Sequence, residues 1–148
     1  MINPDHILTT VWAKLNEDAT FKALVPNVVK GAKRSESYTK KPRTPTATVH
    51  LLTAPIDGET DAMRCTIAVN VYAADHSDGR MDSKFLGEAA SRITALFHKN
   101  YNLKHPDLDL VFKSVLVQEP LIGLKGEFEG EHFASVKIRM IVKSKGGN

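Results

Sequence analysis

Apolar residues recur at helical spacing near the start of the chain. They stand three or four residues apart, at Ile7, Leu8, Val11, Trp12 and Leu15. This spacing places them on one face of a helix. Asn3 is suited to cap that helix, and Pro4 fits its first turn, where the backbone nitrogen needs no hydrogen-bond partner. A shorter helix is expected over "ATFKALVP", ending before Pro26.

A second helical pattern lies in the segment "MDSKFLGEAASRITALFHKN". Asp82 or Ser83 is placed to cap this helix at its start. Its apolar stripe predicts a buried face made of Phe85, Leu86, Ala89, Ala90, Ile93, Leu96 and Phe97. The small residues Gly87, Ala89 and Ala90 indicate that the helix approaches a sheet closely.

Two long segments alternate apolar and polar residues with the period of a strand. In "RCTIAVNVYAA", one face is formed by Cys65, Ile67, Val69, Val71 and Ala73. In "GEHFASVKIRMIVKSK", the inward positions are Ala134, Val136, Ile138, Met140 and Val142, and the outward ones are Ser135, Lys137, Arg139 and Lys143. Shorter strands are expected over "NVVKG", over residues 46–53 and over residues 108–119.

The order of these elements predicts the fold class. Helices precede and interrupt a series of strands, so two to three helices are expected to cover one face of a sheet. We therefore predict an α+β fold of two layers, with a mostly antiparallel sheet of about four to five strands. Residues 1–148 are expected to form a single domain. The glycine-rich segment 120–130, "PLIGLKGEFEG", is expected to form a mobile hairpin or flap.

Bulk composition is that of a globular domain. Of 148 residues, 42% are hydrophobic and 25% are charged. The sequence contains no apolar run near the roughly 18 residues that crossing a bilayer requires, so no membrane partner is expected. Its first residues, "MINPDHILTT", lack the pattern of a secretory signal. Cys65 is the single cysteine, which excludes an internal disulfide and favours a cytosolic folding environment.

Positive charge is concentrated in one segment. Residues 30–43 contain six basic residues and one acidic residue, whereas the rest of the chain holds 14 basic and 16 acidic residues. Residues 30–46 are polar, contain Pro42 and Pro45 and have no regular period, so a long exposed loop is expected there. It could remain solvated, grip nucleic acid, or pair with an acidic protein surface. Tyr38 is its only aromatic residue, which is weak support for a nucleic-acid grip.

Candidate catalytic and metal-binding residues are few. The six histidines do not fall at the spacing of a helical metal site. Asp75, His76 and Asp78 make the best acidic loop, but the segment departs from a calcium-binding pattern and is interpreted as a turn and helix cap. Cys65 lies on the inward face of a strand and is interpreted as a packing residue. We therefore expect no catalytic residue, no metal site, no cofactor and no enzyme activity.

The layout of the chain resembles the tail terminator, or tail completion, proteins of long-tailed bacteriophages and related tail-like particles. The matching features are the opening helix "DHILTTVWAKLNEDATFKALV" and the long loop into "TPTATVHLLT". They continue with the strand, loop and helix of "CTIAVNVYAADHSDGRMDSKFLGEAASRITALF" and with the late strand ending "HFASVKIRMIV". The resemblance covers nearly the whole chain and rests on pattern.

The resemblance implies a structural virion protein that forms a ring with copies of itself, commonly a hexamer. Such a ring caps the head-proximal end of the tail tube, stops tube growth and offers a docking face to the head–neck connector. DNA would pass through the ring without sequence-specific binding. The protein would reside in the virion and, before assembly, in the host cytoplasm. A neighbouring subunit could cover strand edges, either near residues 46–53 or at the terminal strand.

Five basic residues are the candidate partner contacts, against an acidic rim of the tube or neck: Lys33, Arg34, Lys40, Lys41 and Arg43. Three alternatives stay open. One is a small nucleic-acid-binding module that uses the basic loop 30–43, and another is a different head–tail joining protein of the neck. The third is a hydrolase with a site around Asp75, His76 and Asp78.

Overall fold

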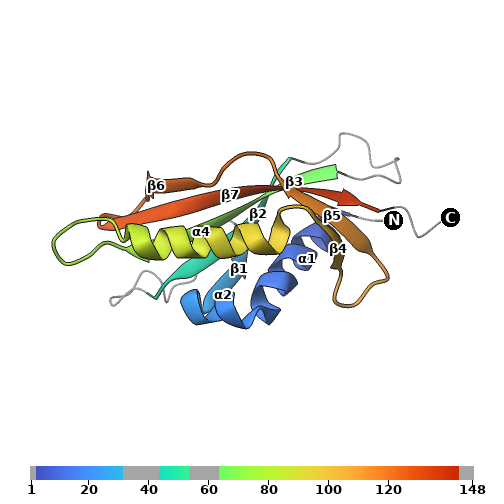
Figure 1. Cartoon of the computed structure of the whole chain (residues 1–148), viewed down its shortest axis with the longest axis horizontal. Helices are drawn as coiled ribbons and strands as arrows, with labels where there is room; N and C mark the ends of the chain where they lie inside the picture. Colours follow the sequence, from blue (N-terminus) through green and yellow to red (C-terminus); the bar gives the residue numbers. More distant parts are fainter. Residues whose placement is uncertain (1–2, 32–43, 54–63, 144–148) are drawn as a thin grey trace.

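The computed structural model describes residues 3–31, 44–53 and 64–143, which form helices packed on one sheet (Figure 1). The helices are α1 (Pro4–Glu17), α2 (Ala19–Leu24) and α4 (Ser83–Phe97). The strands are β1 (Asn27–Lys30), β2 (Thr46–Thr53), β3 (Arg64–Ala74), β4 (Asn100–Lys104), β5 (Val111–Leu116), β6 (Leu121–Lys125) and β7 (Glu131–Val142).

Strand β7 lies at the centre of the sheet. The strand order is β1-β2-β3-β7-β5-β4, and β6 also pairs with β7. One edge of β7 pairs with β3 along eleven residue positions, from Arg64–Ile141 to Ala74–Glu131. Its other edge pairs first with β6 and then with β5, because the two short strands follow one another along it. The terminal strand is therefore no free edge, contrary to one of the expectations from the sequence.

The two-layer α+β class is as predicted, but the sheet is larger and more mixed. The described part contains seven strands instead of four to five, and β1 and β2 run parallel while the other pairings are antiparallel. Strand β4 was missed because "NYNLK" is short and polar and buries only Leu103. Strand β5 is shorter than predicted, since a turn precedes Val111. Within 120–130, residues Leu121–Lys125 form β6, a strand that pairs with β7 with one irregularity in the register.

The core lies between the sheet and the helices, which all cover the same face (Figure 1). The predicted inward residues of β3 and β7 are all buried, Cys65 and Met140 among them. From α1, Ile7, Val11 and Leu15 are fully buried against them. Trp12 is only half-buried: its indole Nε1 donates to the Val28 carbonyl at 3.1 Å and so fastens α1 to β1.

Helix α4 lies across the middle of the sheet. The side chain of Asp82 caps it by accepting from the Phe85 backbone N–H at 3.2 Å, as one of the two predicted caps. Ala89 and Ala90 are buried, in keeping with a close approach to the sheet. Gly87 was misassigned, because it is half-buried and a Cβ added there would meet nothing within 4 Å. It faces a groove and not the sheet.

The β6–β7 hairpin depends on two glycines. Gly123 has φ +86° at an irregularity in the β6–β7 register, a backbone conformation that glycine adopts without strain. A Cβ at Gly126 would collide with the side chain of Glu131, which is buried and accepts from the Phe128 backbone N–H at 3.2 Å. The glycine-rich composition of 120–130 thus permits a bulge and a tight turn.

Candidate functional site

The basic residues singled out from the sequence fall outside the described residues. Lys33, Arg34, Lys40, Lys41 and Arg43 all belong to 32–43. The structure describes the two strands that flank this segment, β1 and β2. Lys30 ends β1 beside Val49, and β2 begins at Thr46 beside Asn27, because the two strands pair in parallel.

The acidic loop after β3 is a turn whose polar side chains have separate partners. Asp78 binds Arg80 at 2.7 Å, Asp75 contacts His132 Nδ1 at 2.6 Å, and His76 lies 3.6 Å from Asp82. Because each carboxylate is engaged by a different group, the loop does not gather Asp75, His76 and Asp78 around one reaction centre. The arrangement is that of the turn and helix cap that the sequence indicated.

The shifted pKa values of Asp78 and Cys65 reflect structural roles. The hydrogen bond from Arg80 lowers the pKa of Asp78 below its usual value. Burial raises the pKa of the Cys65 thiol, which keeps it protonated and therefore a weak nucleophile. Cys65 is fully buried on the inward face of β3, where the alternation of the strand predicted a packing residue.

Among the described residues, no three His, Cys, Asp or Glu side chains gather closely enough to hold a metal ion. Within that part of the chain, none of the helices combines the length and the apolar composition needed to cross a bilayer.

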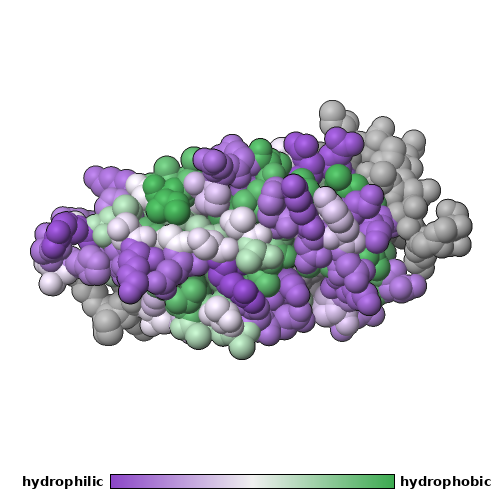
Figure 2. All heavy atoms as spheres, viewed as in Figure 1, coloured by the Kyte–Doolittle hydropathy of each residue, from purple (hydrophilic) through white to green (hydrophobic). Residues whose placement is uncertain are grey.

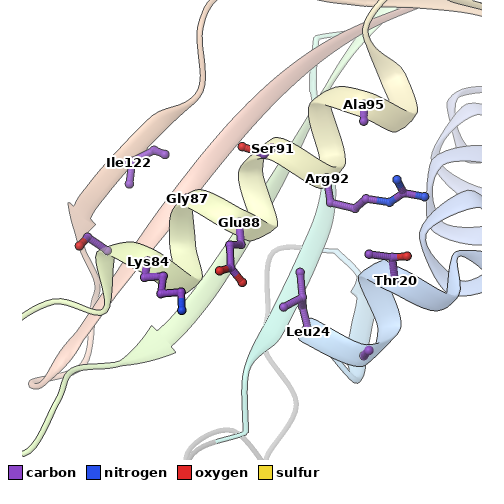
Figure 3. A pocket seen from close by; sticks show the side chains of 11 residues that line it. Thr20, Leu24, Lys84, Gly87, Glu88, Ser91, Arg92, Ala95 and Ile122 are labelled. Atoms are coloured by element: carbon purple, nitrogen blue, oxygen red, sulfur yellow. The ribbon is translucent and has the colours of Figure 1, made fainter.

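A groove of about 1040 Å³ opens on the helix side of the molecule, between α2, α4 and β6 (Figure 3). We call it the α2–α4–β6 groove. Small residues of α4 form its floor, with apolar groups at its sides, as the lining residues Ala23, Leu24, Gly87, Ser91, Ala95 and Ile122 show. The remaining lining consists of hydroxyls, one carboxylate and two cationic side chains, with neither histidine nor cysteine. Such a surface is suited to contact with another macromolecule.

An ion pair holds the two helices of the groove together. Arg92 on α4 donates to both carboxylate oxygens of Asp18, at 2.8 Å from Nε and 2.5 Å from Nη2. Asp18 also caps α2 by accepting from the Phe21 backbone N–H at 2.8 Å. The hydrogen bonds from Arg92 lower the pKa of Asp18 below its usual value, and the cap lowers it further. One carboxylate therefore fixes both the start of α2 and its distance from α4.

Exposed apolar side chains cluster at two places. Leu51 and Leu52, 37% and 44% exposed, lie where β2 extends beyond the residues that pair with β1. Leu121 and Ile122, 38% and 45% exposed, lie on β6, and Figure 2 shows hydrophobic atoms on the surface over that strand. Exposed apolar groups of this kind beside an open strand edge are typical of surfaces that meet another protein.

Sequence reasoning missed a second group of basic residues. The face of the sheet opposite the helices, which we call the open sheet face, carries Arg64, Lys113, Lys137 and Arg139 at outward positions of β3, β5 and β7. Counting charge along the chain concealed them, because acidic residues of loops and helices balance them in the sum. Strand alternation signalled only Lys137 and Arg139, and the register brings the other two beside them.

Comparison with known proteins identifies the fold. No protein-family model matches the sequence, and no curated protein matches it significantly. A solved chain from the virion of a native gene transfer agent particle matches with a TM-score of 0.62 and 15% identity, covering 93% of this chain and 95% of that one. A second solved protein, whose name states no function, matches with a TM-score of 0.59 and 16% identity, covering 97% and 98%. This chain shares their fold over nearly its whole length.

We predict that Asp18→Ala lowers the free energy of unfolding by about 1–2 kcal/mol, because it removes the cap of α2. Asp18→Asn should cost less, since its amide oxygen can still cap the helix. The folded pKa of Asp18 lies below the unfolded value of 3.8, so its charge stabilises the fold above pH 3.8 and ceases to do so as the pH falls through the folded pKa.

Urea unfolding of the wild type and both variants at neutral pH, and then down through pH 3.8, measures this effect. The difference in unfolding free energy between wild type and Asp18→Asn should close as the pH falls. A difference that is constant across this range would show that the ion pair with Arg92 contributes nothing through charge.

Proposed function

We propose that this protein is a structural component of a phage-like virion, forming a ring that caps the head-proximal end of the tail tube. The observation that carries the proposal is the fold shared with a chain of a gene transfer agent virion, over 93% of this chain and 95% of that one. The layout of the sequence supports the same role independently, since it resembles tail terminator proteins. Assembly would begin in the host cytoplasm and end in the virion.

A ring of identical subunits needs two different contact surfaces on each subunit, because each copy presents one patch to the next and another to the previous. The described residues include two candidates. One is the α2–α4–β6 groove, and the other is the end of β2 beyond its pairing with β1, where Leu51 and Leu52 are exposed. We propose that the groove receives a neighbouring copy in a ring, commonly a hexamer. Among the described residues, this end of β2 and all of β6 pair along one edge only, which supports the proposal because strand edges favour pairing with another chain.

The two faces of the ring would differ in what they bind. One would fit the last ring of the tube protein, and the other would accept the head–neck connector and refuse a further tube subunit. We propose that Lys33, Arg34, Lys40, Lys41 and Arg43 contact an acidic rim of the tube or neck. The role needs no catalytic group, and the partners of Asp75 and Asp78 in the loop after β3 support a non-enzymatic role.

Removing the gene tests the role directly. Without a cap, tube growth has no stop and the head has no docking face, so electron micrographs should show tails of variable and excessive length, separate from filled heads. Uniform tails joined to heads would contradict the proposal. Restoring the gene from a plasmid should return uniform tails, which controls for effects on neighbouring genes.

Replacing Lys33, Arg34, Lys40, Lys41 and Arg43 together with serine should abolish tail completion and leave the thermal unfolding transition unchanged. The counts of joined particles and the transition are both measured. A control variant loses five other basic residues, namely Lys14, Arg80, Lys99, Lys104 and Lys125, and should complete tails normally. Equal activity of the two variants would show that the basic segment makes no specific contact.

Ile122→Glu should keep the protein out of the ring, because it places an unpaired charge in an apolar contact. We expect its amount in purified particles, measured by immunoblot, to fall at least about tenfold, the factor that 1.4 kcal/mol produces. Leu108→Glu is the matched control, since Leu108 is 43% exposed and lies outside the groove. Normal incorporation of Ile122→Glu would exclude the groove as a subunit contact.

A further inference from the structure

The strands and the rest of the chain differ sharply in charge. In the seven strands of the described part, Glu131 is the only acidic residue, and it is just 1% exposed. The same strands contain seven basic residues: Lys30, Arg64, Lys104, Lys113, Lys125, Lys137 and Arg139. The other acidic residues of the described part lie in helices, turns and loops. The sheet is a basic layer inside a protein whose total charge is only +3.

Strand register gathers four of these bases on the open sheet face. Arg64 and Lys113 flank Ile141 from its two sides, since both pair with it across β7. Arg139 lies two residues from Ile141 on the same face, and Lys137 lies two residues further. Neighbouring strands are about 4.8 Å apart and alternate residues about 6.7 Å apart, so adjacent members of this cluster stand within about 10 Å at their backbones.

The cluster is accessible, and its charges have no ionic partner among the described residues. Arg64, Lys113 and Arg139 are exposed and Lys137 is half-buried. None of their side chains has a hydrogen bond or an ion pair with another described residue. Among the described residues, the acidic residues that flank β5 in the chain are Asp107, Asp109 and Glu119, which belong to connecting segments. These four side chains therefore present positive charge that would attract a polyanion.

We propose that the open sheet face binds the phosphate backbone of duplex DNA, without sequence preference. The inference rests on the proposed function, in which DNA passes through a ring of these subunits, and it makes this sheet face the one turned toward that DNA. A patch of four contacts per subunit gives weak, salt-sensitive binding. Such binding holds DNA near the ring axis while still allowing it to move.

The chemistry of the face favours duplex DNA over a protein partner. Protein interfaces are depleted of lysine, whereas this face carries Lys113 and Lys137. The exposed apolar residues Val117 and Leu121 border the cluster, Val117 opposite Lys137 and Leu121 opposite Ser135. A neutral hydroxyl side chain continues the face at Thr66, as is common beside phosphate contacts. Tyr72 and Phe133 stack on each other at 5.0 Å, so they do not form the free aromatic platform that single strands need.

The test is the salt dependence of binding to a duplex of about 20 base pairs, measured by fluorescence anisotropy with two unrelated sequences. Lys113→Gln, Lys137→Gln and Arg139→Gln are combined in one variant. The affinity of the wild type falls as salt rises from about 50 to about 200 mM. Because the variant has lost three phosphate contacts, its affinity should fall by a factor about 40-fold smaller over the same range. Both sequences should give the same result.

Two controls isolate the position of the charge. Lys14→Gln, Arg80→Gln and Lys99→Gln remove the same net charge outside the strands and should leave the salt dependence unchanged. Lys113→Arg, Lys137→Arg and Arg139→Lys keep the charge on the open sheet face and should also bind as the wild type does. Matching thermal transitions among the variants show that the fold is retained. The variant with serine at the five basic positions of residues 33–43 measures separately how much that segment contributes to DNA binding.

Three outcomes overturn the proposal. The first is no binding of the wild type to duplex DNA at low salt. The second is an unchanged salt dependence when Lys113, Lys137 and Arg139 are replaced with glutamine. The third is an equal loss of salt dependence when Lys14, Arg80 and Lys99 are replaced instead. Binding to polyglutamate in place of DNA would also overturn it and assign the face to an acidic protein. Electron micrographs of the gene deletion test the proposed ring separately. If the deletion gives overlong tails but the protein does not bind DNA, the proposed function is supported and only the DNA-binding face is excluded.

Discussion

The pairing of β7 along both of its edges is the interaction on which the structure depends. β3 occupies one edge for eleven residue positions, and β5 and β6 share the other. Every second residue of β7, from Ala134 to Val142, faces the core and is buried beneath α4. One strand thus joins the two halves of the sheet and supplies the centre of the core, and a change that broke its register would invert which residues face the helices.

Covering one face of a sheet with helices leaves the other face to solvent or to partners. Here the two sides have different chemistry: the helix side bears the apolar α2–α4–β6 groove, and the open sheet face bears the basic cluster around Arg139. A protein that works by shape and charge between neighbours needs such separated surfaces. The same separation explains why a nearly balanced charge sum is compatible with a strongly basic surface.

Periodicity predicted the long elements well because burial enforces it. β2 and β3 have the bounds read from the sequence, and α4 buries nearly the whole expected stripe. It failed where pairing, and not side-chain burial, makes the strand: β4 is polar and β6 contains a glycine with positive φ. Among the candidate contact residues, the basic segment could be found from the sequence because its charges are consecutive. Arg64 and Lys113 are far apart in the sequence, and only the strand register places them on either side of Ile141.

A reconstruction of intact particles by electron cryomicroscopy tests the central claim most directly, because it locates the protein and orients its two faces at once. We expect a closed ring of this fold between the last tube ring and the neck, with the open sheet face turned toward the central channel. Finding the protein elsewhere in the particle, or absent from purified virions, would contradict the assignment.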